Sequence, residues 1–279
     1  MAAFRPTRPP PGRLVRLGVV LDARNSAGRL LQIAAMCDRV GIGAVWAGDW
    51  ATLSLLRPAV ERVSLGVDLS EPPGGDDWAR LEITVRDASP RSLEAVRAAA
   101  GGGPERPRLA VAIGGGADPL HWLGFADDVL LEAATVDQVI GAAVALLGAA
   151  AAAGRDPATL GVAARLPVSI GRTVAEARAR WEADPALAAL GPPRDAAIFG
   201  TLEQCHERVI ALAHAGVTDL RCVLPNTADV HDVIAQLTAM TIGTLDKLVP
   251  GAPRSPAPPP PPGWGGRPRF PTGSPTRQR

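Results

Sequence analysis

Short apolar runs alternate with helical patterns along most of this 279-residue chain, and this alternation limits the fold more than any other feature. Strands that alternate with helices form parallel βα units. Nearly continuous apolar strands also fit a sheet that is covered on both faces. The predicted strands are residues 16–22, 44–48, 62–69, 79–87, 108–114, 128–133, part of 160–171, and 219–225.

Helix starts between these runs carry capping signals. An apolar stripe over residues 30–40 predicts the first helix, which ends near Gly41. At three later places a threonine precedes Gln or Glu by three residues, the capping-box pattern of a helix N-terminus. The three pairs are Thr135 with Gln138, Thr173 with Glu176, and Thr201 with Gln204.

Eight predicted strands with helices between them fit a closed barrel. A TIM-type (β/α)8 barrel needs about 250 residues, and residues 17–250 supply 234. We therefore expect an α/β fold of this type. The alternative is a doubly wound open sheet, but the G-x-G-x-x-G fingerprint that it carries after the first strand is absent.

Composition divides the chain into three parts. Residues 1–15 and 251–279 are rich in Pro and Arg and contain no acidic residue, which predicts disordered tails around one barrel domain at 16–250. The whole chain has a net charge of +1, but residues 17–250 hold 20 basic and 28 acidic residues, a net of −8. Nucleic-acid binding needs a basic face, so we expect no nucleic-acid partner for the core.

Cysteine usage and hydropathy bear on the compartment. The three cysteines (Cys37, Cys205 and Cys222) are far apart and odd in number, so they predict neither a disulfide framework nor a C-x-x-C metal site. Residues 1–13 lack the apolar region of a signal peptide. The longest apolar run, 139–153, is shorter than the roughly 18–20 residues of a bilayer span. We expect a cytoplasmic protein with no membrane partner.

Four segments match one known family in order and spacing. Residues 17–50, which end in GIGAVWAGDW, are similar to the opening "aEelGfdsvWvgDH". Residues 106–131 are similar to a strand, glycine turn and "aDgv" strand, and residues 154–181 to "GRDP…aeAr". Residues 199–225 are similar to "vGTpeev…eaGvd". The chain therefore resembles the luciferase-like monooxygenases, which include flavin- and deazaflavin-dependent oxidoreductases.

The resemblance implies a TIM-type barrel, FMN or 8-hydroxy-5-deazaflavin (F420) as cofactor, a small-molecule substrate and a homodimer. Two departures are visible. Only about forty residues separate Leu69 from Arg108, where the family has a longer pocket-lining segment, so we expect a barrel trimmed around its fourth strand. Trp50 also follows Asp49 where the family's "gDH" element has His. An indole cannot shuttle a proton.

Chemistry in such barrels lies at the carboxyl ends of the strands. Asp49 and Glu132 are the candidate catalytic carboxylates, and Trp50 is a candidate to pack on a cofactor ring. The structural alternatives are a helix cap for Asp49 and space filling for Trp50. The other residues selected by strand-end position are Asp22, Asp68, Arg86, Arg172 and Asn226.

A glycine turn follows the strand at 108–114 and precedes a helical pattern. Successive glycine N–H groups at a helix start can bind a phosphate, so Gly114, Gly115 and Gly116 are candidates for binding the cofactor phosphate. The alternative is a flexible turn. The four histidines show no metal-ligand spacing, and we expect no metal site.

The leading hypothesis is a flavin- or deazaflavin-dependent oxidoreductase, either a monooxygenase or a hydride-transfer reductase. The second is a catalytically degenerate barrel that serves as a cofactor-binding or protein-interaction scaffold. A third is an unrelated barrel enzyme acting on a phosphorylated metabolite. Fold alone does not choose among them.

Overall fold

The computed structural model describes residues 15–69, 81–86, 94–98, 107–114, 123–124, 126–132, 135–193, 197–226 and 230–248. The predicted tails lie outside these residues, except for Val15 at the end of the first tail.

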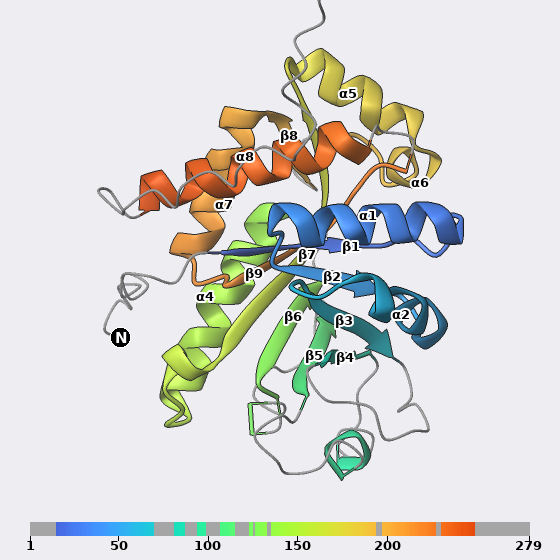
Figure 1. Cartoon of the computed structure of the whole chain (residues 1–279). Coiled ribbons are helices and arrows are strands. Elements are labelled where there is room, and N and C mark those ends of the chain that lie inside the picture. Colours follow the sequence, from blue (N-terminus) through green and yellow to red (C-terminus); the bar gives the residue numbers. More distant parts are fainter. Residues whose placement is uncertain are drawn as a thin grey trace, which may run out of the picture.

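Eight parallel strands close into a barrel, which confirms the predicted fold class (Figure 1). In order around the ring they are β1 (Arg16–Val20), β2 (Ala44–Ala47), β3 (Ser64–Leu69), β4 (Leu81–Val85), β5 (Arg108–Gly114), β6 (Asp128–Glu132), β7 (Gly161–Gly171) and β9 (Asp219–Val223). β9 pairs with β1 and closes the ring. All eight fall on the predicted runs.

The ring is complete where trimming was expected. β4 has only five residues, but it pairs with β3 on one side and with β5 on the other. The short connection between Leu69 and Leu81 therefore leaves the sheet itself closed at this point.

One strand was not predicted. β8 (Ile198–Thr201) pairs with the carboxyl-terminal part of β7, from Val168 to Gly171. The amino-terminal part of β7 belongs to the barrel. Figure 1 shows β7 continuing beyond the barrel toward β8. Four residues that lead directly into a helix are too short to show a strand period.

A second, smaller hydrophobic core includes a residue of β8. Ala177, Trp181, Leu187, Ala197 and Phe199 are buried together there, and the rings of Trp181 and Phe199 meet edge to face at 6.5 Å. This small cluster is separate from the main core.

Helices contact the barrel at β2 and β3 and at β6 and β7. α2, α1, α8, α7 and α4 contact one another in that order. Residues 94–98 are helical, and Val96 within them is buried in the main core. The helices are α1 (Ala27–Val40), α2 (Trp50–Leu56), α4 (Val136–Ala152), α5 (Val174–Ala183), α6 (Pro185–Ala188), α7 (Leu202–His214) and α8 (Val230–Leu248). Short 3-10 turns occupy Arg57–Ala59 and Pro157–Thr159.

The predicted caps begin α4, α5 and α7. The Thr135 and Thr201 boxes are reciprocal, with each Gln side chain accepting from the N-cap backbone. At α5 the Thr173 side chain accepts from the Glu176 N–H, but the Glu176 carboxylate accepts from the Arg172 N–H instead. α1 ends at Gly41 as predicted, and Gly41 takes the left-handed φ of 80° that favours glycine there.

Alternation along each barrel strand separates two environments. Outward residues such as Leu17, Val45 and Val67 join the helices in one continuous apolar core. Inward residues are of a different kind: several are charged, and Trp46, Leu130 and Ala163 are buried without joining that core.

Candidate functional site

The centre of the barrel is filled by Trp46 and Arg221. The Arg221 guanidinium carbon lies 3.4 Å from the Trp46 ring centroid, a stacked cation–π contact. Its Nη1 donates to Thr84 Oγ1 at 2.5 Å. Both large side chains are 1% exposed. Burial lowers the pKa of Arg221, and the nearby carboxylates of Asp219 and Asp68 oppose that shift.

Two glycines make room for the indole ring. A Cβ on Gly66 would lie 2.2 Å from Trp46 Cε3, and one on Gly18 would lie 3.0 Å from Trp46 Nε1. Gly66 pairs with Trp46 in the sheet, and Gly18 belongs to β1, on the other side of β2. The ring therefore occupies space that glycines on both neighbouring strands leave open.

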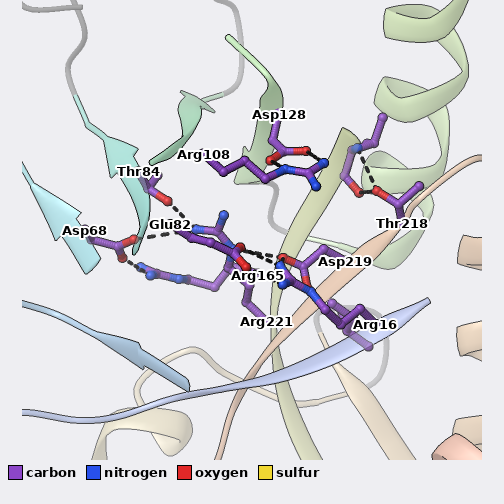
Figure 2. A network of polar contacts seen from close by, with 12 residues as sticks. Arg16, Asp68, Glu82, Thr84, Arg108, Asp128, Arg165, Thr218, Asp219 and Arg221 are labelled. Atoms are coloured by element: carbon purple, nitrogen blue, oxygen red, sulfur yellow. Dashed lines mark hydrogen bonds and ion pairs between the residues drawn. The ribbon is translucent and has the colours of Figure 1, made fainter. Parts of the chain in front are cut away.

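Charged residues fill the amino-terminal end of the barrel (Figure 2). Arg16 contacts Glu82, with Nη2 to Oε2 at 2.6 Å, and Asp219, with Nη2 to Oδ2 at 2.9 Å. Arg108 pairs with Asp128 through Nη2 to Oδ1 at 2.5 Å. Burial raises the pKa of Asp128, against the effect of Arg108. Arg16, which lies just outside the 17–250 stretch whose charge was counted, is thus a further positive charge of the barrel.

A second charged group, the mouth cluster, lies at the carboxyl-terminal ends of the strands. It consists of Asp68, Arg86, Glu132 and Arg165. Arg86 holds Glu132 with two contacts, Nη2 to Oε1 at 2.6 Å and Nη1 to Oε2 at 3.1 Å, and reaches Asp68 Oδ2 at 3.3 Å. Arg165 bonds to the same Asp68 oxygen, and its Nη1 lies 3.7 Å from Glu132 Oε1.

The mouth cluster is partly open to solvent. The side chains of Arg86 and Glu132 are each 31% exposed and that of Arg165 is 20% exposed, whereas Asp68 is 6% exposed. Arg221 lies beneath them, with Nη1 3.6 Å from Asp68 Oδ1, which is longer than a hydrogen bond. A ligand at this end could therefore reach two guanidinium groups and one carboxylate.

The β1 and β9 sector of the mouth forms a separate hydrogen-bonded group. The Asn226 amide donates to Asp22 Oδ2 at 2.7 Å and accepts from the Asn25 amide at 2.7 Å. Its backbone N–H donates to buried Asp184 at 2.7 Å. The hydrogen bond from Arg24 holds the pKa of Asp22 at about 2, below its ordinary value. A cavity of about 20 Å³ beside them has room for one water molecule.

The predicted site residues fall in different positions. Glu132 belongs to the mouth cluster. Asp49 is the N-cap of α2, and its carboxylate accepts from the Thr52 N–H at 2.7 Å and from Thr52 Oγ1 at 3.1 Å. Trp50, the first residue of α2, is half-buried against the main core. Gly114 ends β5, while Gly115 and Gly116 lie outside the described residues.

Sequence reasoning missed Trp46, Arg165 and Arg221 as members of this region. Strand-end position had selected Asp68 and Arg86, but Arg165 and Arg221 lie within apolar runs. The available signal was their register, since a charged residue at an inward position of a buried strand needs a partner across the barrel.

Within the described ranges, no group of three or more His, Cys, Asp or Glu side chains is placed to hold a metal ion. No helix among these residues has the length and apolar character needed to span a membrane. All three cysteines are buried free thiols.

Comparison with known proteins gives similarity of fold. Neither the protein-family models nor the curated proteins contain a match. Among solved structures, the coenzyme F420-dependent tetrahydromethanopterin reductase from Methanopyrus kandleri has a TM-score of 0.65 at 14% identity, over 82% of this chain and 99% of that one. An F420-dependent secondary alcohol dehydrogenase, solved with an F420–acetone adduct, has a TM-score of 0.65 at 13% identity, over 81% and 98%.

A flavoprotein monooxygenase shares the fold as well. The oxygenating constituent of 3,6-diketocamphane monooxygenase from Pseudomonas putida, in complex with FMN, has a TM-score of 0.59 at 12% identity, over 84% of this chain and 98% of that one. The resemblance to luciferase-like proteins is thus confirmed at the level of the fold.

Proposed function

We propose that this chain is a flavin- or deazaflavin-dependent oxidoreductase that binds FMN or F420 across the carboxyl-terminal mouth of its barrel. The observation that carries the proposal is the closed parallel barrel, shared along most of its length with an F420-dependent reductase and an FMN-bound monooxygenase. The substrate is a small molecule.

The residues at the mouth fit a planar cofactor. Trp46 and Arg221 close the interior below, so a flat ring system has to lie across the rim rather than enter the barrel. The rim offers hydrogen-bonding side chains that are partly exposed, as the polar edge of a flavin or deazaflavin requires. Trp50 adds a half-buried aromatic surface at the end of β2.

Each predicted residue then has a defined task. Trp50 would pack on the ring, and the Gly114, Gly115 and Gly116 turn would hold the phosphate. When bound, the cofactor supplies the hydride or oxygen chemistry, while the protein positions it and excludes water. Asp49 and Glu132 remain the candidate carboxylates for proton transfer to the substrate.

A specific observation favours the second candidate function, a barrel that binds a cofactor or a partner without turnover. Both oxygens of Asp49 are engaged by Thr52, and both oxygens of Glu132 are held by Arg86. Trp50, where the family has His, cannot transfer a proton. A positioned acid or base typically contributes about 10²–10⁴-fold to a rate, so its absence would leave binding intact and turnover low.

One experiment separates the two. The purified protein is titrated with FMN and with F420 while its absorption spectrum is followed, and cofactor oxidation or reduction is then assayed. Binding with turnover supports the oxidoreductase, and binding without turnover supports the scaffold. Failure to bind either cofactor would overturn the oxidoreductase and the cofactor-binding scaffold, and would leave a barrel that binds a protein partner. If turnover is found, Asp49→Asn and Glu132→Gln identify which carboxylate contributes.

The remaining expectations go with this proposal. Three buried thiols without a disulfide fit a reducing compartment such as the cytoplasm. A homodimer is expected from the family resemblance, and sedimentation of the purified protein would test it.

A further inference from the structure

Donor N–H groups outnumber their acceptors in the mouth cluster. Each guanidinium carries five N–H donors. Among the described residues, Arg165 has one hydrogen bond, to Asp68. Its Nη1 lies 3.7 Å from Glu132 Oε1, which is too far for a second hydrogen bond. Arg165 Nε is buried with no hydrogen-bond partner. Among the described residues, Arg86 contacts Glu132 and Asp68 through its two Nη atoms.

The charges at the two ends of the barrel also favour an anion at the mouth. Arg86, Arg165 and the deeply buried Arg221 face the two carboxylates of Asp68 and Glu132 at this end of the barrel. At the opposite end, Arg16 and Arg108 face Glu82, Asp128 and Asp219. Arg221 contacts Asp68 and Asp219 at 3.6 and 3.7 Å, so it belongs to both groups. Of these two groups of described residues, the mouth cluster is the more positive.

The two carboxylates of the mouth differ in how they are held. Asp68 is 6% exposed and is shared by three arginines, so it is a fixed part of the barrel. Glu132 is 31% exposed, lies at the last position of β6, and is bound mainly by the equally exposed Arg86. Glu132 therefore occupies a bidentate carboxylate position that faces solvent.

We propose that Arg86 and Arg165 form an anion-recognition site at the barrel mouth, which takes the carboxylate of a small acidic substrate in exchange for Glu132. The identification of the anion as substrate rests on the proposed function, whereas anion binding itself does not. A carboxylate suits the site because two coplanar oxygens match the fork of a guanidinium. The phosphate of FMN shares this anionic chemistry and is the other source to be distinguished.

The test measures binding, independently of turnover. Dissociation constants of succinate, benzoate, inorganic phosphate, FMN and riboflavin are measured by calorimetry at fixed ionic strength for the parent, Arg165→Gln and Glu132→Gln. We expect Arg165→Gln to weaken binding of the acids roughly tenfold or more, because a charged hydrogen-bonding partner is lost. Glu132→Gln should strengthen it by about threefold or more, because a competing like charge is removed.

Opposite effects from two neighbouring substitutions cannot come from a general loss of structure. Arg24→Gln, on the β1 sector of the mouth, is the matched control and should leave acid binding unchanged. Thermal melting of each variant checks that it is folded. If Arg165→Gln does not fold, Arg86→Gln should show the same loss of acid binding.

The flavins identify the source of the anion. Weaker acid binding with unchanged FMN and riboflavin assigns the site to the substrate. A loss confined to FMN and phosphate, with riboflavin unchanged, assigns it to the cofactor phosphate and overturns the substrate assignment. Equal binding of the acids, inorganic phosphate and FMN in the parent and both variants would overturn the anion site, even if FMN binds and the proposed function stands.

Discussion

At the scale of single residues, the barrel interior depends on matched sizes. Trp46 is the largest inward side chain, and both strands that flank β2 carry glycine beside it. Protein interiors are packed as densely as organic crystals, so added volume forces side chains or backbone to move.

Gly66→Ala should therefore lower the free energy of unfolding by about 1–3 kcal/mol or more, as overpacking does. The added Cβ would lie 2.2 Å from Trp46 Cε3. Urea denaturation measures the change. Gly48→Ala is the control, since a Cβ there meets nothing within 4 Å. Combining Gly66→Ala with Trp46→Leu should recover part of the loss, and no recovery would show that the ring is not the obstacle.

The Asp22 carboxylate gives a pH dependence. Its hydrogen bond from Arg24 lowers its pKa to about 2 in the folded state, whereas an unfolded Asp has a pKa of about 3.9. A lowered pKa stabilises the fold above the unfolded value, and this contribution is lost as the pH falls through the folded value.

Asp22→Asn should thus be less stable than the parent at pH 6, by a small amount because Arg24 is exposed. The difference should disappear between about pH 4 and pH 2, as both states become protonated. Denaturation of both proteins across this range provides the measurement. A difference that is independent of pH would mean that the charge of Asp22 contributes nothing.

At the scale of elements, N-cap residues mark the helix starts. One strand, β7, pairs both within the barrel and with β8 outside it. The caps at Thr135 and Thr201 satisfy N–H groups that a helix N-terminus otherwise leaves without partners. β7 pairs with β6 and β9 through its first half and with β8 through its second half. Thr201 is both the last residue of β8 and the N-cap of α7, so it joins this extension to the helical layer.

Thr201→Ala should lower the free energy of unfolding by about 1 kcal/mol, because the cap hydrogen bond to the Gln204 N–H is lost. Thr201→Ser keeps the hydroxyl and should stay within a few tenths of a kcal/mol of the parent. Chemical denaturation of the two variants decides the point. Equal losses in both would place the effect in the methyl group and its packing rather than in the cap.

At the scale of the whole molecule, charges occupy positions inside the barrel that apolar side chains usually fill. Arg221 connects the charged groups at the two ends, and it stacks on the Trp46 ring between them. Removal of one partner from a buried ionic group is costly, because it leaves the other charges without compensation.

Arg221→Met should therefore lower the free energy of unfolding by about 3 kcal/mol, the lower end of the range for a broken buried pair. Asp68 and Asp219 keep Arg165 and Arg16 as partners, which limits the loss. Added salt should not reduce the difference between parent and variant, since buried charges are poorly screened. A loss that vanishes at high salt would mean that Arg221 is reached by solvent.

The sequence by itself determined the elements of this barrel. All eight barrel strands and the starts of α4, α5 and α7 follow from local patterns, because an apolar run records burial and a cap records a helix end within a few residues. β8 was not predicted, because four residues are too few to show the two-residue period of a strand. Glu132 could be selected by position, since strand ends define the mouth of any such barrel.

Only the tertiary structure decided which polar residues meet. Arg165 bonds to Asp68 across 97 positions of sequence, and Arg221 to Thr84 across 137. When the ring closes, side chains that point inward from distant strands come to face one another. The register of each strand sets the position of these side chains along the barrel axis. A pattern along one strand shows that a side chain points inward, but its partners depend on the registers of all the others. The mouth cluster is therefore a property of the closed barrel.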